Sequence, residues 1–319
     1  MYHFCTYFDR NYLFKGLALY NSLRRHSAPF RLWVLCLDDA TREILSRVEL
    51  PGTCLISLRE VEDGDAALLE AKSNRSWLEY YFTLTPSLLL YVLKRHPSMD
   101  AITYLDGDLF FYSDPRPMYE EFGDQSILII EHRFTPDRAH FAKIHGVYNV
   151  GLVAFRNDAE GSRCLQDWRA RCLETCPAEP VDGRYGDQKY LEDWPQRFRN
   201  VVVVQHRGAG LAPWNVGNYT ITRVGQTVMV DSDPLIFYHF YGFQIIAPYL
   251  FGQLYRDVPR RQQNLISASY IAELQKAIRT VRSLVPGFNY GLAKLGDRHL
   301  LRSLLISRLV LAFPPPATP

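Results

Sequence analysis

The sequence predicts an α/β protein in which a mixed, mainly parallel sheet is flanked by helices and followed by a helical C-terminal extension. Short, mainly apolar runs such as residues 2–8 and the continuously apolar 32–37 alternate with longer segments of helical periodicity, such as 12–25. Strands that are apolar throughout are typical of parallel sheets covered on both faces. After residue 255 the pattern changes to helix alone, which predicts the extension.

The elements are expected in the following order. Residues 12–25 form a helix because Leu13, Leu17 and Tyr20 share one face. The aromatic and leucine-rich stretch 77–95 is interrupted by Pro86, which predicts two short helices there. Strands are expected at 2–8, 32–37, 53–58, 101–105, 126–130, 150–155, 201–205 and 235–239, with a further helix at 158–175.

Composition excludes several classes of protein. The 319 residues are 47% hydrophobic and 22% charged, as is usual for folded globular chains, and a net charge of +2 gives no indication of nucleic-acid binding. The six cysteines lack the paired spacing of a zinc site and are expected to be reduced thiols. The chain starts without a secretory signal and has no run of ~20 apolar residues, so we expect a cytoplasmic protein.

The charge is unevenly distributed. Residues 256–319 contain ten Lys or Arg and three Asp or Glu, a net +7, whereas the first 255 residues carry −5. We therefore expect a first domain at 1–255, a basic helical extension at 256–313 and a Pro-rich tail at 314–319. Leucines between 300 and 309 alternate with arginines at near-helical spacing. Such a helix either makes a peripheral contact with an anionic membrane or packs on the first domain or on a second copy in a homodimer.

Three Asp-x-Asp triplets occur, at 63–65, 106–108 and 231–233. The first lies in a polar stretch, and the third precedes Pro234 as a turn between strands does. Only Asp106 and Asp108 follow a buried strand, where two carboxylates lose hydration and repel each other. A divalent cation, Mn²⁺ or Mg²⁺, would compensate both effects, because these ions prefer oxygen ligands. The alternative is that the two aspartates cap the turn.

The segment 104–111, with Asp106-Gly107-Asp108, resembles the Asp-x-Asp strand end of nucleotide-sugar-dependent glycosyltransferases with the Rossmann-like GT-A fold, especially glycosyltransferase family 8 and its relatives. Further segments match that family in order, and together they span residues 6–242. They are Thr6-Tyr7-Phe8-Asp9 with Asn11-Tyr12, Asn149-Val150-Gly151, Gly186-Asp187-Gln188, Pro213-Trp214-Asn215, and the His-x-x-Gly of His239 and Gly242.

The resemblance implies a metal-dependent transfer of a sugar from a nucleotide-sugar donor, a UDP-sugar, to a glycan, a glycolipid or another hydroxyl acceptor. It implies retention at the sugar, with Gln188 and Asp187 as catalytic residues, and a role in building a surface polysaccharide or glycolipid. It also implies metal ligation by Asp106, Asp108 and His239, donor contacts from Thr6, Tyr7, Asp9, Asn11, Tyr12, Gly107 and Gly242, and sugar or acceptor contacts from Asn149, Gly151, Trp214 and Asn215.

Several of these residues also have a purely structural interpretation. His239 also fits a core histidine at a strand end, and Asp187 fits the N-cap of a helix running to Trp194. Trp214, Tyr148 and Tyr241 offer flat faces for sugar stacking, yet aromatic side chains more often pack in cores.

The sequence departs from the family at two phosphate contacts. No Lys-Pro-Trp follows the His-x-x-Gly segment, and Thr83 stands where the family commonly has arginine. Lys72 and Arg75 are candidate substitutes for binding the donor, or else solvated charges. Glu131 is the candidate base that an inverting enzyme would need, or else an exposed strand-end charge.

Two rival functions remain open. A haloacid-dehalogenase-type phosphotransferase also uses Asp-x-Asp after a strand, but in that class the pair follows the first strand. In this chain, three predicted strands precede the strand that leads into Asp106. A non-catalytic carbohydrate-binding or scaffold protein on the same fold would have no use for an intact set of Asp106, Asp108, Gln188 and His239.

Overall fold

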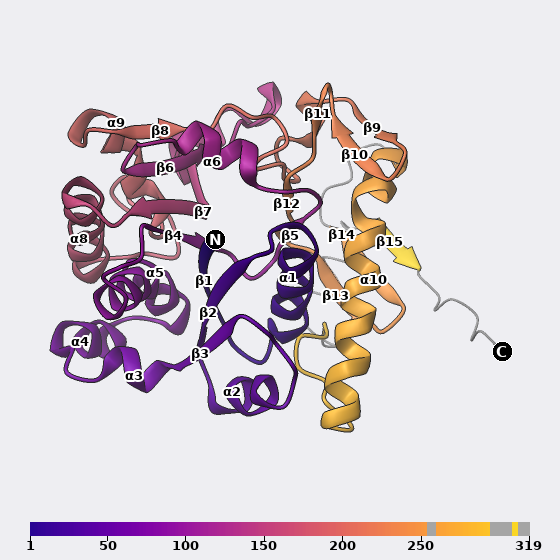
Figure 1. Ribbon diagram of the computed structural model, residues 1–319, viewed down its shortest axis with the longest axis horizontal. Helices are drawn as coiled ribbons and strands as arrows, with labels where there is room; N and C mark the ends of the chain where they lie inside the picture. The colour runs from indigo at the N-terminus through magenta and orange to yellow at the C-terminus, as the bar shows by residue number, and fades with distance from the viewer. Residues whose placement is uncertain (254–259, 294–307, 312–319) are drawn as a thin grey trace.

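The computed structural model describes residues 1–253, 260–293 and 308–311. Its centre is a seven-stranded sheet with strand order β3-β2-β1-β4-β7-β6-β8 (Figure 1). The first four of these strands are parallel and β8 is parallel to β6, whereas β7 pairs antiparallel with β4 and β6. The predicted mixed, mainly parallel sheet is therefore confirmed. Its strands are β1 (Tyr2–Phe8), β2 (Phe30–Cys36), β3 (Thr53–Ser57), β4 (Ala101–Leu105), β6 (Ile127–Glu131), β7 (Tyr148–Arg156) and β8 (Val201–Val203).

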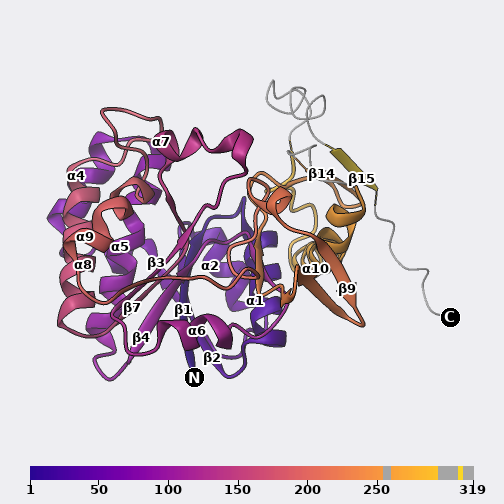
Figure 2. The same ribbon diagram turned by 90° about the horizontal axis from the view of Figure 1, so that it is seen from above.

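Helices cover both faces of the sheet, and the buried side chains form two hydrophobic clusters, one on each face (Figure 2). Local sequence sets where the helices begin. The Asp38 carboxylate accepts a hydrogen bond from the Thr41 N–H at the start of α2, and Ser76 and Glu79 form a capping box at the start of α5. One face carries α1 (Leu13–His26), α2 (Asp39–Ser46), α6 (Arg116–Phe122) and α10 (Arg260–Leu284); the other carries α3 (Leu58–Glu62), α4 (Ala66–Asn74), α5 (Trp77–Arg95), α8 (Ala159–Glu174) and α9 (Trp194–Arg197).

The helix α5 runs unbroken through Pro86, so the prediction of two short helices in 77–95 is wrong. A proline inside a helix costs about 3 kcal/mol, through a lost backbone hydrogen bond and a steric clash. Ten residues of α5 are buried, including Leu84 and Leu88, which are fully buried. Burial of one leucine contributes roughly 1.5–3 kcal/mol, so packing of this face outweighs the defect.

Smaller sheets continue from the edge of the main one. The turn at 231–233 lies between two strands, as the sequence predicted. β5 (Leu109–Phe111) pairs with β12 (Phe237–His239); β9 (Ile221–Val224), β10 (Thr227–Val230) and β11 (Asp233–Pro234) form a second sheet; β13 (Gln244–Ala247), β14 (Leu250–Gln253) and β15 (Arg308–Leu311) form a third. Short helical segments are η1 (Pro136–Arg138), α7 (Phe141–His145), η2 (Gln188–Asp193) and η3 (Val216–Asn218).

The C-terminal part is only partly helical. Within the predicted extension, α10 buries Ile266, Leu274 and Ile278 in the same cluster as α1, and the two helices lie side by side in both ribbon views. The amphipathic helix expected to run through 300–313 is wrong at 308–311, because that segment pairs antiparallel with β14 as β15. The rest of that predicted helix, 300–307 and 312–313, and the Pro-rich tail lie outside the described residues.

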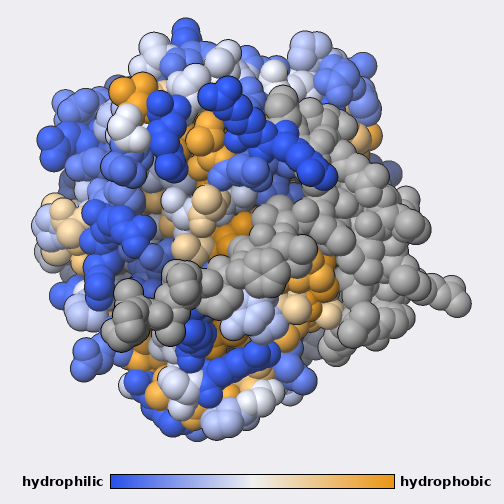
Figure 3. Space-filling view, turned by 90° about the vertical axis from the view of Figure 1, so that its right-hand side faces the viewer, coloured by the Kyte–Doolittle hydropathy of each residue, from blue (hydrophilic) through white to orange (hydrophobic). Residues whose placement is uncertain are grey.

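All six cysteines carry free thiols, as the sequence predicted. In the ranges that the structure describes, no helix combines the length and apolar character needed to cross a bilayer. On the face of the molecule beside α10, hydrophilic side chains predominate among the described residues, with smaller hydrophobic areas between them (Figure 3).

Candidate active site

Two short strands build the acidic site beyond the end of β4. Asp106 and Asp108 follow Leu105, and the chain then continues as β5. β12 pairs antiparallel with β5 so that His239 lies opposite Leu109, next to Asp108. The Phe240 N–H donates to the Asp108 carbonyl at 3.0 Å, and the Asp106 N–H donates to the Gly151 carbonyl at 2.9 Å. Segments more than a hundred residues apart in sequence therefore meet at this turn.

The side chains of Asp106, Asp108 and His239 face one another. His239 Nε2 lies 3.1 Å from Asp108 Oδ1 and 3.5 Å from Asp106 Oδ2. One ligand atom from each of the three residues lies within 4.8 Å of the others. The other ring nitrogen, His239 Nδ1, is buried and has no hydrogen-bond partner among the described residues. Two carboxylates and one imidazole are a donor set that suits Mn²⁺ or Mg²⁺, so the residues fit a divalent cation.

The three ionisable groups influence one another strongly. Burial raises the pKa of Asp106. Burial also opposes ionisation of Asp108, but His239 and Lys15 outweigh it and hold the pKa of Asp108 at about 2. Burial alone would lower the pKa of His239, whereas the two carboxylates raise it, and the carboxylates prevail. The cluster therefore holds its protons and charges as one unit.

Lys15 is a site residue that sequence reasoning missed. It lies on α1, is only 8% exposed, and places Nζ 3.7 Å from Asp108 Oδ2. Its ammonium also lies 4.2 Å from the centre of the Tyr12 ring. A signal was present, because Lys15 is the one charged residue in the buried run Leu13 to Tyr20.

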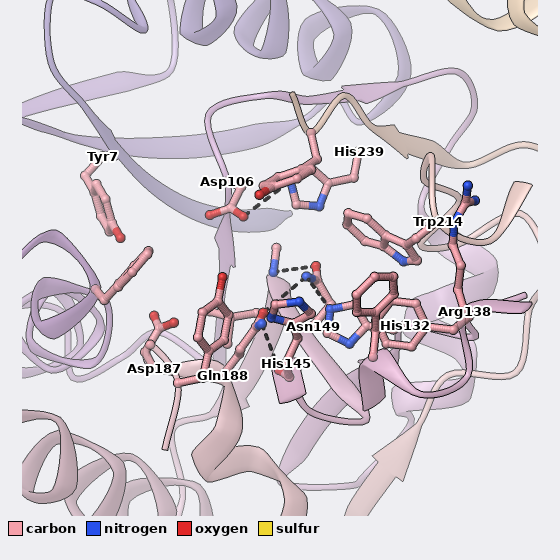
Figure 4. A pocket seen from close by; sticks show the side chains of 18 residues that line it. Tyr7, Asp106, His132, Arg138, His145, Asn149, Asp187, Gln188, Trp214 and His239 are labelled. Carbon is pink, nitrogen blue, oxygen red and sulfur yellow. Dashed lines mark hydrogen bonds and ion pairs between the residues drawn. The ribbon is translucent and has the colours of Figure 1, made fainter. Parts of the chain in front are cut away.

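A cavity of about 230 Å³ opens beside this cluster (Figure 4). Tyr7 and Asp187 lie toward one end of it and Trp214 toward the other, with Asp106 and His239 between them. The structure thus brings together Asn149, Gly151 and Trp214 of the residues expected at the sugar, and Tyr7 of those expected at the donor. The lining residues predicted from the sequence are Tyr7, Asp106, Asn149, Gly151, Asp187, Gln188, Trp214, His239 and Tyr241; those missed include Phe82, His132, Phe134, Arg138, Phe141, His145 and Tyr185.

Gly151 is required by a close approach on β7. Its N–H donates to Asn149 Oδ1 at 2.9 Å. A Cβ atom at this position would lie 2.5 Å from Asn149 Oδ1 and 2.8 Å from His239 Nδ1, closer than real Cβ contacts allow. The Asn-x-Gly segment therefore joins the metal cluster to the rest of the cavity.

A chain of hydrogen bonds orients Gln188. The pKa of His132 is lowered to about 3 by burial, so the imidazole is neutral. Its Nδ1 faces the Val147 carbonyl at 3.3 Å, which leaves Nε2 to accept a bond from Asn149 Nδ2 at 3.2 Å. Asn149 Nδ2 also lies 3.5 Å from Gln188 Oε1, while Gln188 Nε2 donates to the His145 carbonyl at 2.8 Å. These contacts turn the Gln188 oxygen toward Asn149.

Asp187 does not act as a helix cap. The following element is the 3₁₀ helix η2 and then α9, in place of the predicted single helix, and no capping hydrogen bond comes from the Asp187 side chain. The residue is buried, and burial raises the pKa of its carboxyl to about 7. Asp187 thus stands at the N-cap position of η2, as predicted, but its side chain makes no capping hydrogen bond there, and its buried carboxyl group lines the cavity.

Comparison with known proteins places the chain in a family. No family model matches the sequence. The chain is 35% identical to YfnD of Bacillus subtilis strain 168, over 91% of this chain and 94% of YfnD. It is 33% identical to YfnF of the same organism, over 92% of this chain and 98% of YfnF. The chain belongs to the family of YfnD and YfnF. Both relatives are described as uncharacterized.

The fold of this YfnD-family protein resembles a solved glycosyltransferase. The crystal structure of the galactosyltransferase LgtC, in complex with donor and acceptor sugar analogues, matches with a TM-score of 0.52 and 14% identity. The match covers 94% of this chain and 99% of the LgtC chain. The expected GT-A fold is thereby confirmed.

Several predicted donor residues of the YfnD-family protein lie beside the cavity without lining it. Asp9 accepts hydrogen bonds from the N–H and Nδ2 of Asn11, which closes the turn between β1 and α1. Gly107 lies against the ring of Tyr12, so this turn and the Asp-x-Asp turn are in contact. Thr6 is fully buried, and its Oγ1 has no hydrogen-bond partner among the residues that the structure describes. Gly242 has a φ of +69° in the turn after β12.

Lys72 and Arg75 are engaged elsewhere. Lys72 Nζ lies 2.7 Å from Glu62 Oε1. Arg75 donates to Thr83 Oγ1 and to the carbonyls of Cys172 and Leu173. Neither residue lines the cavity, so we do not carry them into the proposed donor site.

Three other candidates lie off the main cavity. Asn215 is fully buried and donates to the carbonyls of His132 and Gly210, so it shapes the loop that carries Trp214. Glu131 lines a separate small cavity behind Asn149, and Tyr148 does not line the main one.

Proposed function

We propose that the protein is a metal-dependent glycosyltransferase that moves a sugar from a UDP-sugar donor to a hydroxyl of a glycan or glycolipid acceptor, with retention at the anomeric carbon. One observation supports this most. A single cavity holds Asp106 and His239 of the three-ligand cluster together with Asp187 and Gln188. Metal-ligating side chains beside the diphosphate and polar side chains beside the sugar are both needed where a sugar leaves a diphosphate.

The bond changes define what the site must do. The bond between the anomeric carbon and the diphosphate oxygen breaks, and its electron pair stays on that oxygen. A bond forms from the acceptor hydroxyl oxygen to the anomeric carbon, and the hydroxyl proton passes to the leaving diphosphate. Asp106, Asp108 and His239 would hold a divalent cation, which supplies Lewis acidity toward the leaving group when bound.

The chain's own side chains bind and orient the sugar. Gln188 lines the cavity with its carboxamide oxygen held beside Asn149, where it can stabilise positive charge that develops on the sugar ring. Asn149 fixes that orientation through the contacts described above. The Trp214 ring lines the cavity, and its buried Nε1 has no hydrogen-bond partner among the described residues, so it is available to a sugar hydroxyl. Tyr7 lies at the opposite end, where we place the nucleoside.

The position of Glu131 favours retention. An inverting enzyme needs a carboxylate base beside the acceptor hydroxyl. Glu131 lines the separate small cavity. Among the described residues, the carboxyl groups that line the main cavity are those of Asp106 and Asp187.

Thermal unfolding with nucleotides tests the proposal. We expect UDP to raise the Tm in the presence of Mn²⁺ and not in its absence, because a ligand that binds the native state stabilises it. Asp108→Asn should abolish the shift and donor hydrolysis. Asp63→Asn, in the exposed triplet outside the site, is the matched control and should leave both unchanged. No metal-dependent shift with UDP, GDP or their sugars would contradict the proposal.

We also propose that the enzyme works in the cytoplasm at the inner face of the membrane, where a lipid-linked acceptor would be presented. The net +7 of residues 256–319 supports this, because basic segments bind anionic lipid. Sedimentation of the full chain and of a truncation after Tyr290 with anionic liposomes tests it. Equal pelleting would contradict the membrane contact, and a change from dimer to monomer on truncation would support the homodimer interpretation.

A further inference from the structure

Lys15 is a buried cation placed behind the metal-binding cluster. It extends from the first turn of α1 to within 3.7 Å of Asp108 Oδ2. Neither Lys15 nor Asp108 lines the cavity, whereas Asp106 and His239 do. Lys15 therefore contacts the cluster from the side away from the cavity. Both α1 and the strand pair β5 and β12 belong to one hydrophobic cluster, which fixes this arrangement.

A protonated lysine cannot ligate a metal, so its effect on the cluster is electrostatic. With Lys15 in place, the two carboxylates and the ammonium leave the cluster with one net negative charge when His239 is neutral. A bound divalent cation changes this to one net positive charge, which a dianionic diphosphate then binds. Without Lys15 the loaded cluster would be neutral and would attract the diphosphate less.

This charge bears on the two phosphate contacts that the chain lacks. Thr83 accepts a hydrogen bond from Arg75, and the segment after Gly242 continues as β13, which contains no Lys or Arg. Other parts of the fold can supply positive charge near the diphosphate: Arg138 lines the cavity, and Lys15 adds a charge through the cluster.

We propose that Lys15 weakens the binding of the free divalent cation and strengthens the binding of the nucleotide diphosphate to the metal-loaded site. The inference rests on the proposed function, because it assumes a divalent cation at Asp106, Asp108 and His239. The Lys15 charge thereby makes the metal and the nucleotide bind cooperatively. A merely structural role, in which Lys15 only holds Asp108 in place, predicts that its loss weakens both ligands.

Isothermal titration separates the two roles. Mn²⁺ alone is titrated into metal-free protein, and UDP is then titrated into protein saturated with Mn²⁺. Lys15→Met should bind Mn²⁺ roughly three- to tenfold more tightly and UDP roughly three- to tenfold more weakly, as expected for removing a partly screened charge a few ångströms away. Lys15→Arg keeps the charge and should behave nearly as wild type. Lys94→Met, at an exposed lysine of α5, is the control for a change in total charge.

The outcomes are distinct. Weaker binding of both ligands by Lys15→Met, or no change in either, would overturn the inference while leaving the proposed function intact. Failure of the wild-type protein to bind Mn²⁺ both alone and in the presence of UDP would reject the proposed function and this inference with it. If Lys15→Met does not fold, Lys15→Gln carries the same test, because its neutral amide can still donate a hydrogen bond to Asp108.

Discussion

Gly151 shows how one residue couples two parts of the site. Its missing side chain lets β7 pass beside the ring of His239 and lets its N–H reach Asn149 Oδ1. Any larger residue must displace Asn149, His239 or both. The cluster of Asp106, Asp108 and His239 and the part of the cavity beside Asn149 therefore share one steric constraint.

We expect Gly151→Ala to weaken Mn²⁺ binding and donor hydrolysis together. The added methyl would fall 2.5 Å from Asn149 Oδ1 and 2.8 Å from His239 Nδ1, and the displaced ring would no longer face the carboxylates. A loss of activity on the order of a hundredfold is expected for a shift of about 1 Å at reacting groups. Gly64→Ala, outside the site, is the control for a strained glycine change: no atom of the described residues lies within 4 Å of its added methyl, and its φ of +73° predicts a loss of stability with unchanged Mn²⁺ affinity. Unchanged Mn²⁺ affinity in Gly151→Ala would contradict the coupling.

Asp187 should make stability depend on pH. Burial raises the pKa of its carboxyl to about 7, from an ordinary value near 3.8. The folded protein therefore holds this proton more tightly than the unfolded chain does, and the stability it contributes is present below pH ~4 and lost as the pH rises toward 7. Asp187→Asn should remove this loss, which is on the order of a few kcal/mol.

Denaturant unfolding between pH 4 and pH 8 measures this difference. The variant should be more stable than wild type at pH 8, and the gap should close as the pH approaches 4. Subtracting the two curves cancels the titration of groups that both proteins share. Parallel curves across this range would show that the Asp187 carboxyl ionises normally.

At the scale of elements, β6, β7 and η2 meet at the part of the site that holds Gln188. His132 follows the end of β6, Asn149 lies on β7, and Gln188 begins η2. The hydrogen bonds from His132 through Asn149 to Gln188 link these three elements. The orientation of the Gln188 carboxamide thus depends on the spacing of β6 and β7.

We expect His132→Ala to lower kcat for donor hydrolysis by roughly ten- to a hundredfold, because Asn149 loses its acceptor and Gln188 loses its orientation. Mn²⁺ affinity should stay the same, since His132 does not touch the metal cluster. His132→Asn offers an amide oxygen to Asn149 and should recover part of kcat. His140→Ala, at an exposed histidine nearby, is the control. A loss confined to KM would point to direct substrate binding by His132.

The sequence could predict those elements whose own residues decide their structure. β1 and β4 are mainly apolar runs, and the Asp-x-Asp turn follows from the strand before it. Lys15 and His132 could not be assigned, because their partners Asp108 and Asn149 are brought to them only by tertiary packing. The same holds for Pro86, whose cost is offset by neighbours on other elements. β15 is an apolar run as well, but its leucines also fit the near-helical spacing of residues 300–309, and pairing with β14 decides for the strand.

At the scale of the whole molecule, α10 supports the metal cluster from the opposite end of the chain. Tyr270 on α10 is fully buried and stacks on the Phe240 ring, with centroids 3.8 Å apart and planes 15° apart. Phe240 follows His239 and donates its N–H to the Asp108 carbonyl. Glu273 on α10 accepts hydrogen bonds from Asn21 and Arg25 of α1, which hold α10 against α1.

Tyr270→Ala should therefore lower both stability and metal binding. Removing a fully buried aromatic ring costs about 3–5 kcal/mol of unfolding free energy, because its burial is lost and a cavity is left behind. The cavity would open against Phe240, so the backbone that carries His239 and contacts Asp108 would be held less firmly. Mn²⁺ affinity should therefore fall several-fold. Tyr290→Ala, at a tyrosine that is 44% exposed, is the matched control and should change neither quantity appreciably. Urea unfolding with and without Mn²⁺ measures both effects, and a destabilised Tyr270→Ala variant with wild-type Mn²⁺ affinity would show that α10 stabilises the fold without positioning the site.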